Sequence, residues 1–515
     1  MRRRVFLAGG AAGAVVAVSA QSVVGCSTAT DERPDAGSSA EGEVARLREE
    51  YPDFDTDYVD NAIAPFLQNS VFDGQRPVLP MIDVALTKEN ALPSDLWGLL
   101  SEKWGPDPEK GVTVFLQGLE LRGPDNRRKR IYMSAVTPDL YDRMYKGKVV
   151  RFWDELLSQQ NSEKPLMRIY LDTFWDLYWD LHLGVRGSDI PDQVREIGAS
   201  FNAVLAHRDP TQKIVYDNYM AVRERLTFLK SWIDDRLADI GSGKTREPEK
   251  TFAWYWLKNG EESEYFNHQD VVFECFHNFV AFSQWGNSLY NVMSNLGREG
   301  GDPQAKDWFT KTMAGDYDKP DGSAFPPLER LVMELFRTIS PNGGSISALE
   351  PTRPPAFESH GYINTPHPST SRDPVQWPNP DDFDPSRYQA APTSQQIDEA
   401  RIRQMGLANC PFTPTDFPVK DGRAAALRNS AFGTVFGVID NRPRPVCDYA
   451  GFAPFGFGYR RFPGEQLTTM AFEDLLRKVA RDRIEFVKVV PNNAEQLPIG
   501  PNTVIGDDIG FVRLS

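Results

Sequence analysis

One helix and the proline-rich segment that follows it constrain the fold of this chain most strongly. Glu334 and Arg337 are three positions apart in a predicted helix, residues 328–340, so both side chains lie on one helical face and can pair. The sequence then continues with RDPxxW at 372–377 and NPDxFDPxRY at 379–388. An arginine from such a distant loop can complete a charge-assisted network with the helical pair. A glutamate and an arginine three apart carry no information alone, but the three patterns together are a strong signal.

At these residues the chain resembles the cytochrome P450 superfamily. The resemblance implies that Glu334, Arg337 and Arg387 form a structural triad, which maintains the fold beneath a haem and takes no part in chemistry. It extends over about residues 46–515. The fold class that it implies is mainly α-helical with small β-sheets (α+β), in a single large domain.

A second segment, FGFGYRRFPG at 455–464, agrees with the superfamily's haem loop at every fixed position except one. Its glycines allow a tight turn and a close approach of the backbone to a porphyrin. The resemblance implies that Arg460 contacts a haem propionate and that Phe455 and Gly464 belong to the same cofactor site. Phe462 stands where the iron-ligating cysteine is expected, and phenylalanine has no lone pair for a metal. The chain is therefore identified as a divergent relative with an unknown axial ligand.

An upstream segment, residues 123–138, is similar to the helix of this superfamily that reaches the haem propionates. Arg130 falls on the propionate-binding arginine, while Asn126 replaces the usual histidine. A solvated helix face is the alternative interpretation of the basic run at 127–130.

The spacing from Glu334 makes residues 281–287 the counterpart of the superfamily's distal helix, which usually carries an acid–alcohol pair. This stretch has neither an acid nor a threonine, and Ser283 and Gln284 are its candidate catalytic residues. The string FSQWG at 282–286 faintly resembles the allene oxide synthase and hydroperoxide lyase branch, with Ser283 in place of an asparagine. Packing in a helix core explains the same aromatic residues equally well.

Other iron ligands find little support. Cys447 reads as a free cysteine and His277 as a packed histidine, although either could approach a haem. The six histidines show no metal-ligand spacing, and the four cysteines show no CxxC pair, so no metal site is predicted.

The first residues of the chain predict export. Arg3-Arg4 and the apolar run that follows look like a twin-arginine signal, and VVGC at 23–26 is similar to a bacterial lipobox. Cys26 would then be the lipidated first residue of the mature protein, although an ordinary signal peptide is the alternative. We expect a signal at 1–25, a flexible tether at 26–45 and the folded domain at 46–515. The protein would be exported across the bacterial inner membrane and held on it by the lipid anchor alone.

The remaining pattern is mostly helical, with a loop-rich connection at 297–327, an unusually long insertion at 389–454 and short strands at 484–490 and 509–514. The other predicted helices are 137–159, 165–184, 191–207, 211–240, 268–296 and about 464–482. A net charge of −15 without a strong basic cluster argues against a nucleic-acid partner.

Three functions follow from these features. The first is a haem protein with altered iron ligation that oxidises a lipophilic small molecule, with peroxide in place of an external electron supply. The second is a hydroperoxide lyase or isomerase of the allene oxide synthase type. The third is a haem-free protein that binds an apolar ligand or a partner. None of them is an ordinary thiolate monooxygenase, so whether the chain is an enzyme stays open.

Overall fold

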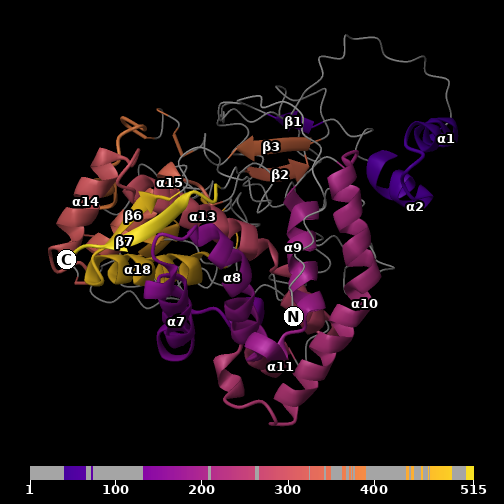
Figure 1. The fold of residues 1–515 in the computed structure, drawn as a ribbon, viewed down its shortest axis with the longest axis horizontal. Helices are drawn as coiled ribbons and strands as arrows, with labels where there is room; N and C mark the ends of the chain where they lie inside the picture. Colours follow the sequence, from indigo (N-terminus) through magenta and orange to yellow (C-terminus); the bar gives the residue numbers. More distant parts are fainter. Residues whose placement is uncertain are drawn as a thin grey trace.

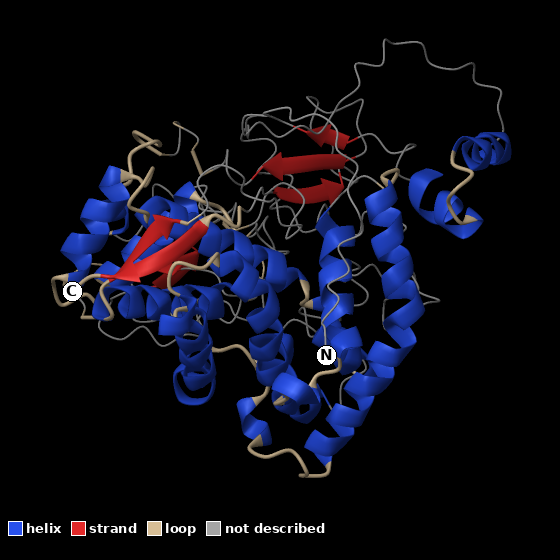
Figure 2. Ribbon diagram, viewed as in Figure 1, coloured by secondary structure: helices blue, strands red, loops and turns tan. Residues whose placement is uncertain are grey.

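Helices make up most of the described part of the chain, and short strands form three small sheets (Figures 1 and 2). The predicted fold class, mainly helical with small β-sheets, is confirmed. The computed structural model describes residues 40–64, 71–73, 131–206, 210–260, 266–319, 321–323, 325–341, 344–348, 362–366, 371–372, 374, 377–389, 436–439, 442–445, 454–455, 462, 464–489 and 506–515.

The α-helices are α1 (Ala40–Glu50), α2 (Thr56–Tyr58), α6 (Pro138–Leu140), α7 (Lys146–Leu156), α8 (Leu166–Leu183), α9 (Asp192–Ala206), α10 (Lys213–Gly241), α11 (Phe252–Gly260), α12 (His268–His277), α13 (Val280–Leu296), α14 (Pro303–Met313), α15 (Pro327–Thr338) and α18 (Glu465–Arg481). Two π-helical stretches, η1 (Val59–Ile63) and η6 (Tyr141–Tyr145), continue α2 and α6. Short 3₁₀ turns are η7 (Gln159–Asn161), η8 (Gly187–Asp189), η9 (Pro248–Lys250) and η11 (Pro385–Tyr388).

The strands are β1 (Val71–Asp73), β2 (Gly344–Ala348), β3 (Tyr362–Pro366), β4 (Phe436–Ile439), β5 (Arg442–Pro445), β6 (Ile484–Lys488) and β7 (Ile509–Arg513). In the three-stranded sheet, β3 pairs with β1 in parallel and with β2 in antiparallel orientation. The pairs β4–β5 and β6–β7 are antiparallel. The two strands predicted after residue 482 are therefore β6 and β7, which lie against α13 and α18 (Figure 1).

The predicted helix over 268–296 is wrong in one respect, because the structure breaks it into α12 and α13 at Asn278 and Phe279. The Asn278 side-chain amide donates to the carbonyl of Glu274, at 2.8 Å, and its Oδ1 accepts from the Tyr132 hydroxyl, at 3.0 Å. A side chain that bonds to nearby backbone competes with the regular helix. Asn278 thus ends α12, and its side chain links the break between α12 and α13 to Tyr132.

The loop-rich connection predicted over 297–327 contains a helix, α14, which the sequence reading missed. Asp302 is its N-cap, and the carboxylate accepts from the amides of Gln304 and Ala305. Pro303 occupies the first helical position, where its missing N–H is not needed. An aspartate–proline pair is equally typical of a turn, so the local pattern misled the prediction.

Helix α1 begins at Ala40, which lies inside the stretch 26–45 expected to form the tether. The chain after α1 packs onto the start of α10 through aromatic rings. The Tyr58 hydroxyl donates to the carbonyl of Pro210, at 2.7 Å, and Tyr216 accepts from the amide of Asp55, at 3.1 Å. The described folded part thus extends to residue 40.

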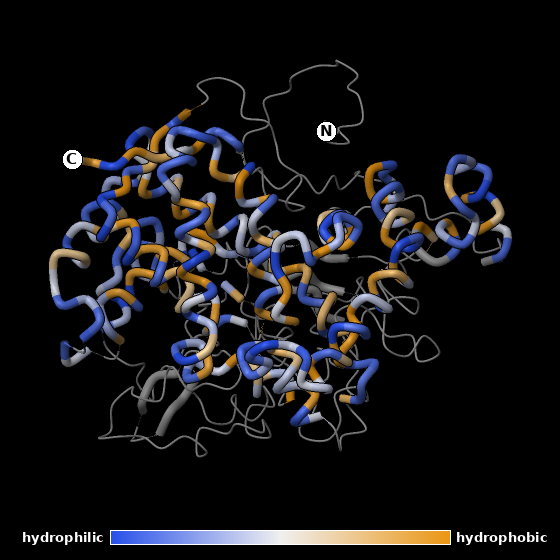
Figure 3. The backbone as a smooth tube through the Cα atoms, turned by 60° about the horizontal axis from the view of Figure 1, so that its bottom comes forward, coloured by the Kyte–Doolittle hydropathy of each residue, from blue (hydrophilic) through white to orange (hydrophobic). Residues whose placement is uncertain are grey.

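Aromatic rings join α7, α8, α13 and α18 in the core. Trp153 stacks on Trp285 with centroids 6.0 Å apart, and its Nε1 donates to the carbonyl of Ala471, at 2.9 Å. Tyr170 stacks on Phe282 and donates to its carbonyl, at 2.6 Å. Each such ring pair adds about 0.5–1.5 kcal/mol beyond area burial. Hydrophobic and hydrophilic residues alternate along the helices, as expected when one side of each faces this core (Figure 3).

Candidate functional site

The pair predicted from the sequence, Glu334 and Arg337, is fully buried on α15. The Arg337 guanidinium donates from Nε to Oε2 of Glu334 and from Nη2 to Oε1, both at 2.8 Å. Two parallel hydrogen bonds of this kind are stronger and more directional than a single ion pair.

The remaining guanidinium donors hold the proline-rich segment. Arg337 donates to the carbonyls of Ser371 and Pro380, each at 2.8 Å, and of Asp382, at 2.9 Å. The ring of Trp377 lies 5.4 Å from its guanidinium carbon. The buried Arg337 guanidinium therefore has a hydrogen-bond partner for each of its donors, as the burial of a charge requires.

Arg387 joins the same network. Its Nε lies 3.4 Å from Oε1 of Glu334, and the Tyr388 hydroxyl donates to Oε2 at 3.0 Å. Burial, together with the Glu334 carboxylate, raises the pKa of Tyr388 well above its ordinary value, so the phenol stays a donor. The structure thus brings Glu334, Arg337 and Arg387 together, and the Arg337 guanidinium also holds the backbone at Ser371, Pro380 and Asp382.

The two described ends of the predicted haem loop meet each other. The amide of Phe462 donates to the carbonyl of Phe455, at 2.9 Å. Phe455 is buried and lies edge-on to Phe336 of α15, with centroids 5.4 Å apart. A Cβ added to Gly464 would lie 2.6 Å from the Phe462 ring, so the glycine is what lets this ring pack there.

A pocket of about 60 Å³ lies against Phe462. Its wall is mostly apolar and comes from α8, α11, the α12–α13 break, α13, α18 and residues 132–136. The lining side chains are those of Tyr132, Val136, Phe174, Leu177, Tyr178, Leu181, His182, Phe252, Asn278, Ala281, Trp285, Phe462, Leu467 and Thr468, beside Gly464.

The stretch expected to be distal, residues 281–287, contributes Ala281 and Trp285 to this pocket. Trp285 is buried, and its Nε1 donates to Oγ1 of Thr468 on α18, at 3.0 Å. The indole therefore spans the space between α13 and the helix that follows Phe462.

The candidate catalytic residues lie elsewhere on the same helix. The Ser283 hydroxyl donates to the carbonyl of Val280, at 3.0 Å, and neither Ser283 nor Gln284 lines the pocket. His277 is held by Glu274, at 3.1 Å, and stacks on Phe273. Its placement is that of a packed histidine.

His182 is a pocket residue that the sequence reading did not single out. Its Nδ1 lies 2.8 Å from the carbonyl of Tyr178 one turn earlier, and its ring stacks on the Tyr178 ring. Burial lowers the pKa of His182 to about 3, so the ring is neutral. No local pattern in the helix at 165–184 marks this histidine, because its role depends on packing between distant segments.

The residues at this site do not fit a haem held as the loop resemblance implies. Phe462 has no lone pair for iron. The 60 Å³ pocket has room for about five water molecules, and a porphyrin is several times larger. The Trp285 indole also occupies space between the two elements that the resemblance would place on opposite faces of the macrocycle.

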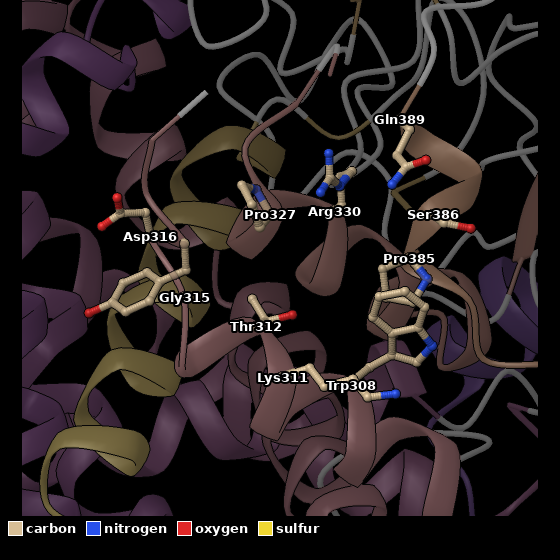
Figure 4. A pocket seen from close by; sticks show the side chains of 11 residues that line it. Trp308, Lys311, Thr312, Gly315, Asp316, Pro327, Arg330, Pro385, Ser386 and Gln389 are labelled. Atoms are coloured by element: carbon tan, nitrogen blue, oxygen red, sulfur yellow. The ribbon is translucent and has the colours of Figure 1, made fainter. Parts of the chain in front are cut away.

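A larger cavity, of about 200 Å³, lies between α14, the start of α15 and η11 (Figure 4). Trp308, Lys311 and Arg330 are among its lining residues. Arg330 is already paired with Asp321, at 2.9 Å, and with the carbonyl of Phe325, at 3.1 Å. The cavity shares no lining residue with the pocket at Phe462.

Several predicted residues lie outside the described part of the chain. These are the lipidation residue Cys26, Asn126, the propionate-binding candidates Arg130 and Arg460, and Cys447. Within the described residues, no group of three or more histidine, cysteine, aspartate or glutamate side chains could hold a metal ion. None of the described helices has the length and apolar character that crossing a bilayer requires.

Comparisons with known proteins agree with the architecture. No protein family model and no curated protein sequence matches the chain. The retinoic-acid-bound cyanobacterial CYP120A1 aligns with 77% of this chain and 82% of its own, at 14% identity and a TM-score of 0.51. The cytochrome P450DA haem domain aligns over 75% and 77%, at 12% identity and a TM-score of 0.49. Ligand-free cytochrome P450 OleT aligns over 76% and 79%, at 11% identity and a TM-score of 0.48. The described elements and the first of these likenesses together show that the chain has a cytochrome P450-like fold.

Proposed function

We propose that this chain is a haem-free protein of cytochrome P450-like fold that binds a small, largely apolar ligand in the pocket at Phe462. The observation that carries the proposal is the position of Phe462 itself. A phenylalanine forms the pocket wall where the resemblance expects an iron ligand, and Trp285 crosses the space beside it.

The pocket selects the ligand by size and polarity. Its wall is built from aromatic and aliphatic side chains, and a dry apolar cavity favours apolar occupants over water. At about 60 Å³ the pocket is well below the roughly 150 Å³ of a cavity that binds benzene. The ligand is therefore smaller than a long-chain lipid.

The other two functions have weaker support from the described residues. A haem with altered ligation needs an axial ligand, and Phe462 supplies none. A hydroperoxide lyase with Ser283 as polarising group needs that side chain at the pocket, but its hydroxyl is bonded to Val280. Both of these functions require haem, so haem content separates them from the haem-free function.

The first experiment measures haem in protein exported from haem-replete cells, with a pyridine haemochrome spectrum. We expect far less than one haem per chain, and stoichiometric haem would overturn the proposal. Phe462→Cys provides a control, because it supplies a thiolate but leaves Trp285 in place. We expect this variant also to lack the red-shifted Soret band of a thiolate-ligated carbon monoxide complex.

The second experiment equilibrates the protein with xenon, an apolar atom small enough for this pocket, and follows thermal stability. We expect saturable binding that raises the melting temperature. Ala281→Phe fills the pocket and should abolish binding, whereas Ala238→Phe on the exposed side of α10 should not. Binding that survives Ala281→Phe would place the site elsewhere.

We also propose that the protein is exported and anchored through a lipid on Cys26. The supporting features are the arginine pair at 3–4 and the VVGC string at 23–26. Labelling with a radioactive fatty acid should mark the wild type and spare Cys26→Ala. A labelled Cys26→Ala protein, or an unlabelled wild type, would count against the anchor.

A further inference from the structure

The cavity of about 200 Å³ between α14, the start of α15 and η11 is large enough for an organic ligand. A cavity of roughly 150 Å³ holds benzene, so this one has room for a ring with a small substituent. Its wall combines the ring side chains of Trp308, Pro327 and Pro385 with Arg330 (Figure 4). Apolar surface with a few fixed polar groups is typical of a ligand site.

Arg330 is held in one orientation by contacts on its far side. Its side chain is only 8% exposed. Oδ1 of Asp321 accepts from Nη1 at 3.2 Å, Oδ2 accepts from Nη2 at 2.9 Å, and the carbonyl of Phe325 accepts from Nη1 at 3.1 Å. The hydrogen bonds from Arg330 lower the pKa of Asp321 below its ordinary value, so both groups stay charged.

These contacts leave one edge of the Arg330 guanidinium unused. The group has five N–H donors, and Asp321 and Phe325 take three of them. The two that remain, on Nε and Nη2, point to the same side of the planar group. No described residue accepts from Nε, and Nε is not among the buried polar atoms that lack a partner, so a water-sized molecule can reach it. Because Arg330 lines the cavity and has little other exposed surface, this edge faces the cavity.

Arg337, two turns later on α15, shows what such an edge binds. Its Nε and Nη2 both donate to the carboxylate of Glu334, each at 2.8 Å. Two parallel N–H donors match the two oxygens of a carboxylate, and the planar group fixes the direction of both bonds. The same edge of Arg330 meets no carboxylate among the described residues. A carboxylate that enters the cavity can therefore form with Arg330 the contact that Glu334 forms with Arg337.

The other charged side chains of the wall are exposed and already paired. Lys311 bonds to Asp307 one turn earlier, and Asp316 bonds to Lys319, at 3.1 Å. The charges of these four groups sum to zero, and exposed pairs of this kind are weak. Recognition of a charged ligand therefore depends on the buried Arg330.

We propose that this cavity is a second ligand site, which binds a single-ring carboxylate. Nε and Nη2 of Arg330 donate to the carboxylate, and the ring packs against Trp308, Pro327 and Pro385. The cavity shares no lining residue with the pocket at Phe462, so this site does not depend on the function proposed there. Since α14, α15 and η11 each supply part of the wall, a bound ligand joins all three and stabilises the fold.

The test compares benzoate with benzamide, which has nearly the same shape but no charge. Isothermal titration and thermal unfolding of the full chain measure the binding. Benzoate should bind saturably and raise the melting temperature. Benzamide should bind about tenfold more weakly, because only the carboxylate accepts two charge-assisted hydrogen bonds.

Arg330→Lys keeps the positive charge but loses the paired donors, so the ratio of benzoate to benzamide affinity should fall about tenfold. Arg195→Lys is the matched control, because Arg195 pairs with Asp176 outside the cavity, and this variant should keep the wild-type ratio. Trp308→Ala should weaken both probes severalfold, since both rings pack on the indole.

Three results would contradict the proposal. They are equal affinities of benzoate and benzamide in the wild type, an unchanged ratio in Arg330→Lys, and no saturable binding of benzoate. Should Arg330→Lys fail to fold, Trp308→Ala decides the matter, because undiminished benzoate binding in that variant would place the site elsewhere. None of these results affects the haem measurement or the xenon experiment, which concern the pocket at Phe462.

Discussion

The indole nitrogen of Trp285 on α13 donates a hydrogen bond to Oγ1 of Thr468 on α18, 183 positions later in the chain. Both side chains are buried and line the same pocket. The bond therefore holds the pocket's two walls together, and it does so through a side chain that occupies the space available for a larger ligand.

The first prediction concerns this bond. Thr468→Val keeps the shape but leaves the buried indole N–H unpaired, which should lower the free energy of unfolding by about 1–3 kcal/mol. Trp285→Phe removes the donor. The double variant should therefore lose less unfolding free energy than the sum of the losses in the two single variants. Urea denaturation of the four proteins measures the coupling. Strict additivity would show that the bond does not contribute.

The second prediction concerns the contact between Gly464 and Phe462. Gly464→Ala should lower the free energy of unfolding by about 1–3 kcal/mol, because the new Cβ overlaps the Phe462 ring. The loss should largely disappear when Phe462 is also alanine. Gly147→Ala is the matched control, since a Cβ there meets nothing within 4 Å. Equal losses with and without the Phe462 ring would contradict this packing.

The third prediction concerns the arginine network. Arg337→Met leaves the buried Glu334 carboxylate without its main partner and should cost about 3–5 kcal/mol of unfolding free energy. Arg372→Met is the control, because its ion pair with Asp381 is exposed and 3.8 Å long, and such pairs contribute at most about 1 kcal/mol. Chemical denaturation curves of similar midpoint for both variants would contradict the assigned role.

Those parts of the site that short-range patterns encode can be predicted from the sequence. Glu334 and Arg337 share one helical turn, and Arg387 belongs to a long motif, so their meeting could be anticipated. The loss of an iron ligand at Phe462 was equally visible, because a single position in a fixed loop had changed.

The pocket itself could not be anticipated. Trp285 and Thr468 meet only through tertiary packing, and the burial of His182 depends on Phe252 of another helix, α11, as well as on Tyr178 one turn away. The break at Asn278 also depends on a distant residue, Tyr132. Periodicity along the chain reports which face of a helix is buried, but not which side chains it meets.

The last prediction uses the charge state of His182. Burial lowers its pKa from an ordinary 6.5 to about 3, so the unfolded chain binds this proton at a higher pH than the folded chain does. Between those values the unfolded state holds more protons, and stability must fall as the pH falls. The slope from this one group approaches about 1.4 kcal/mol per pH unit below pH 6. His182→Phe removes this titrating group. In urea denaturation, the unfolding free energy of the variant should decline less steeply between pH 6.5 and 4.5 than that of the wild type. Parallel declines in the two proteins would mean that His182 is not buried in its neutral form.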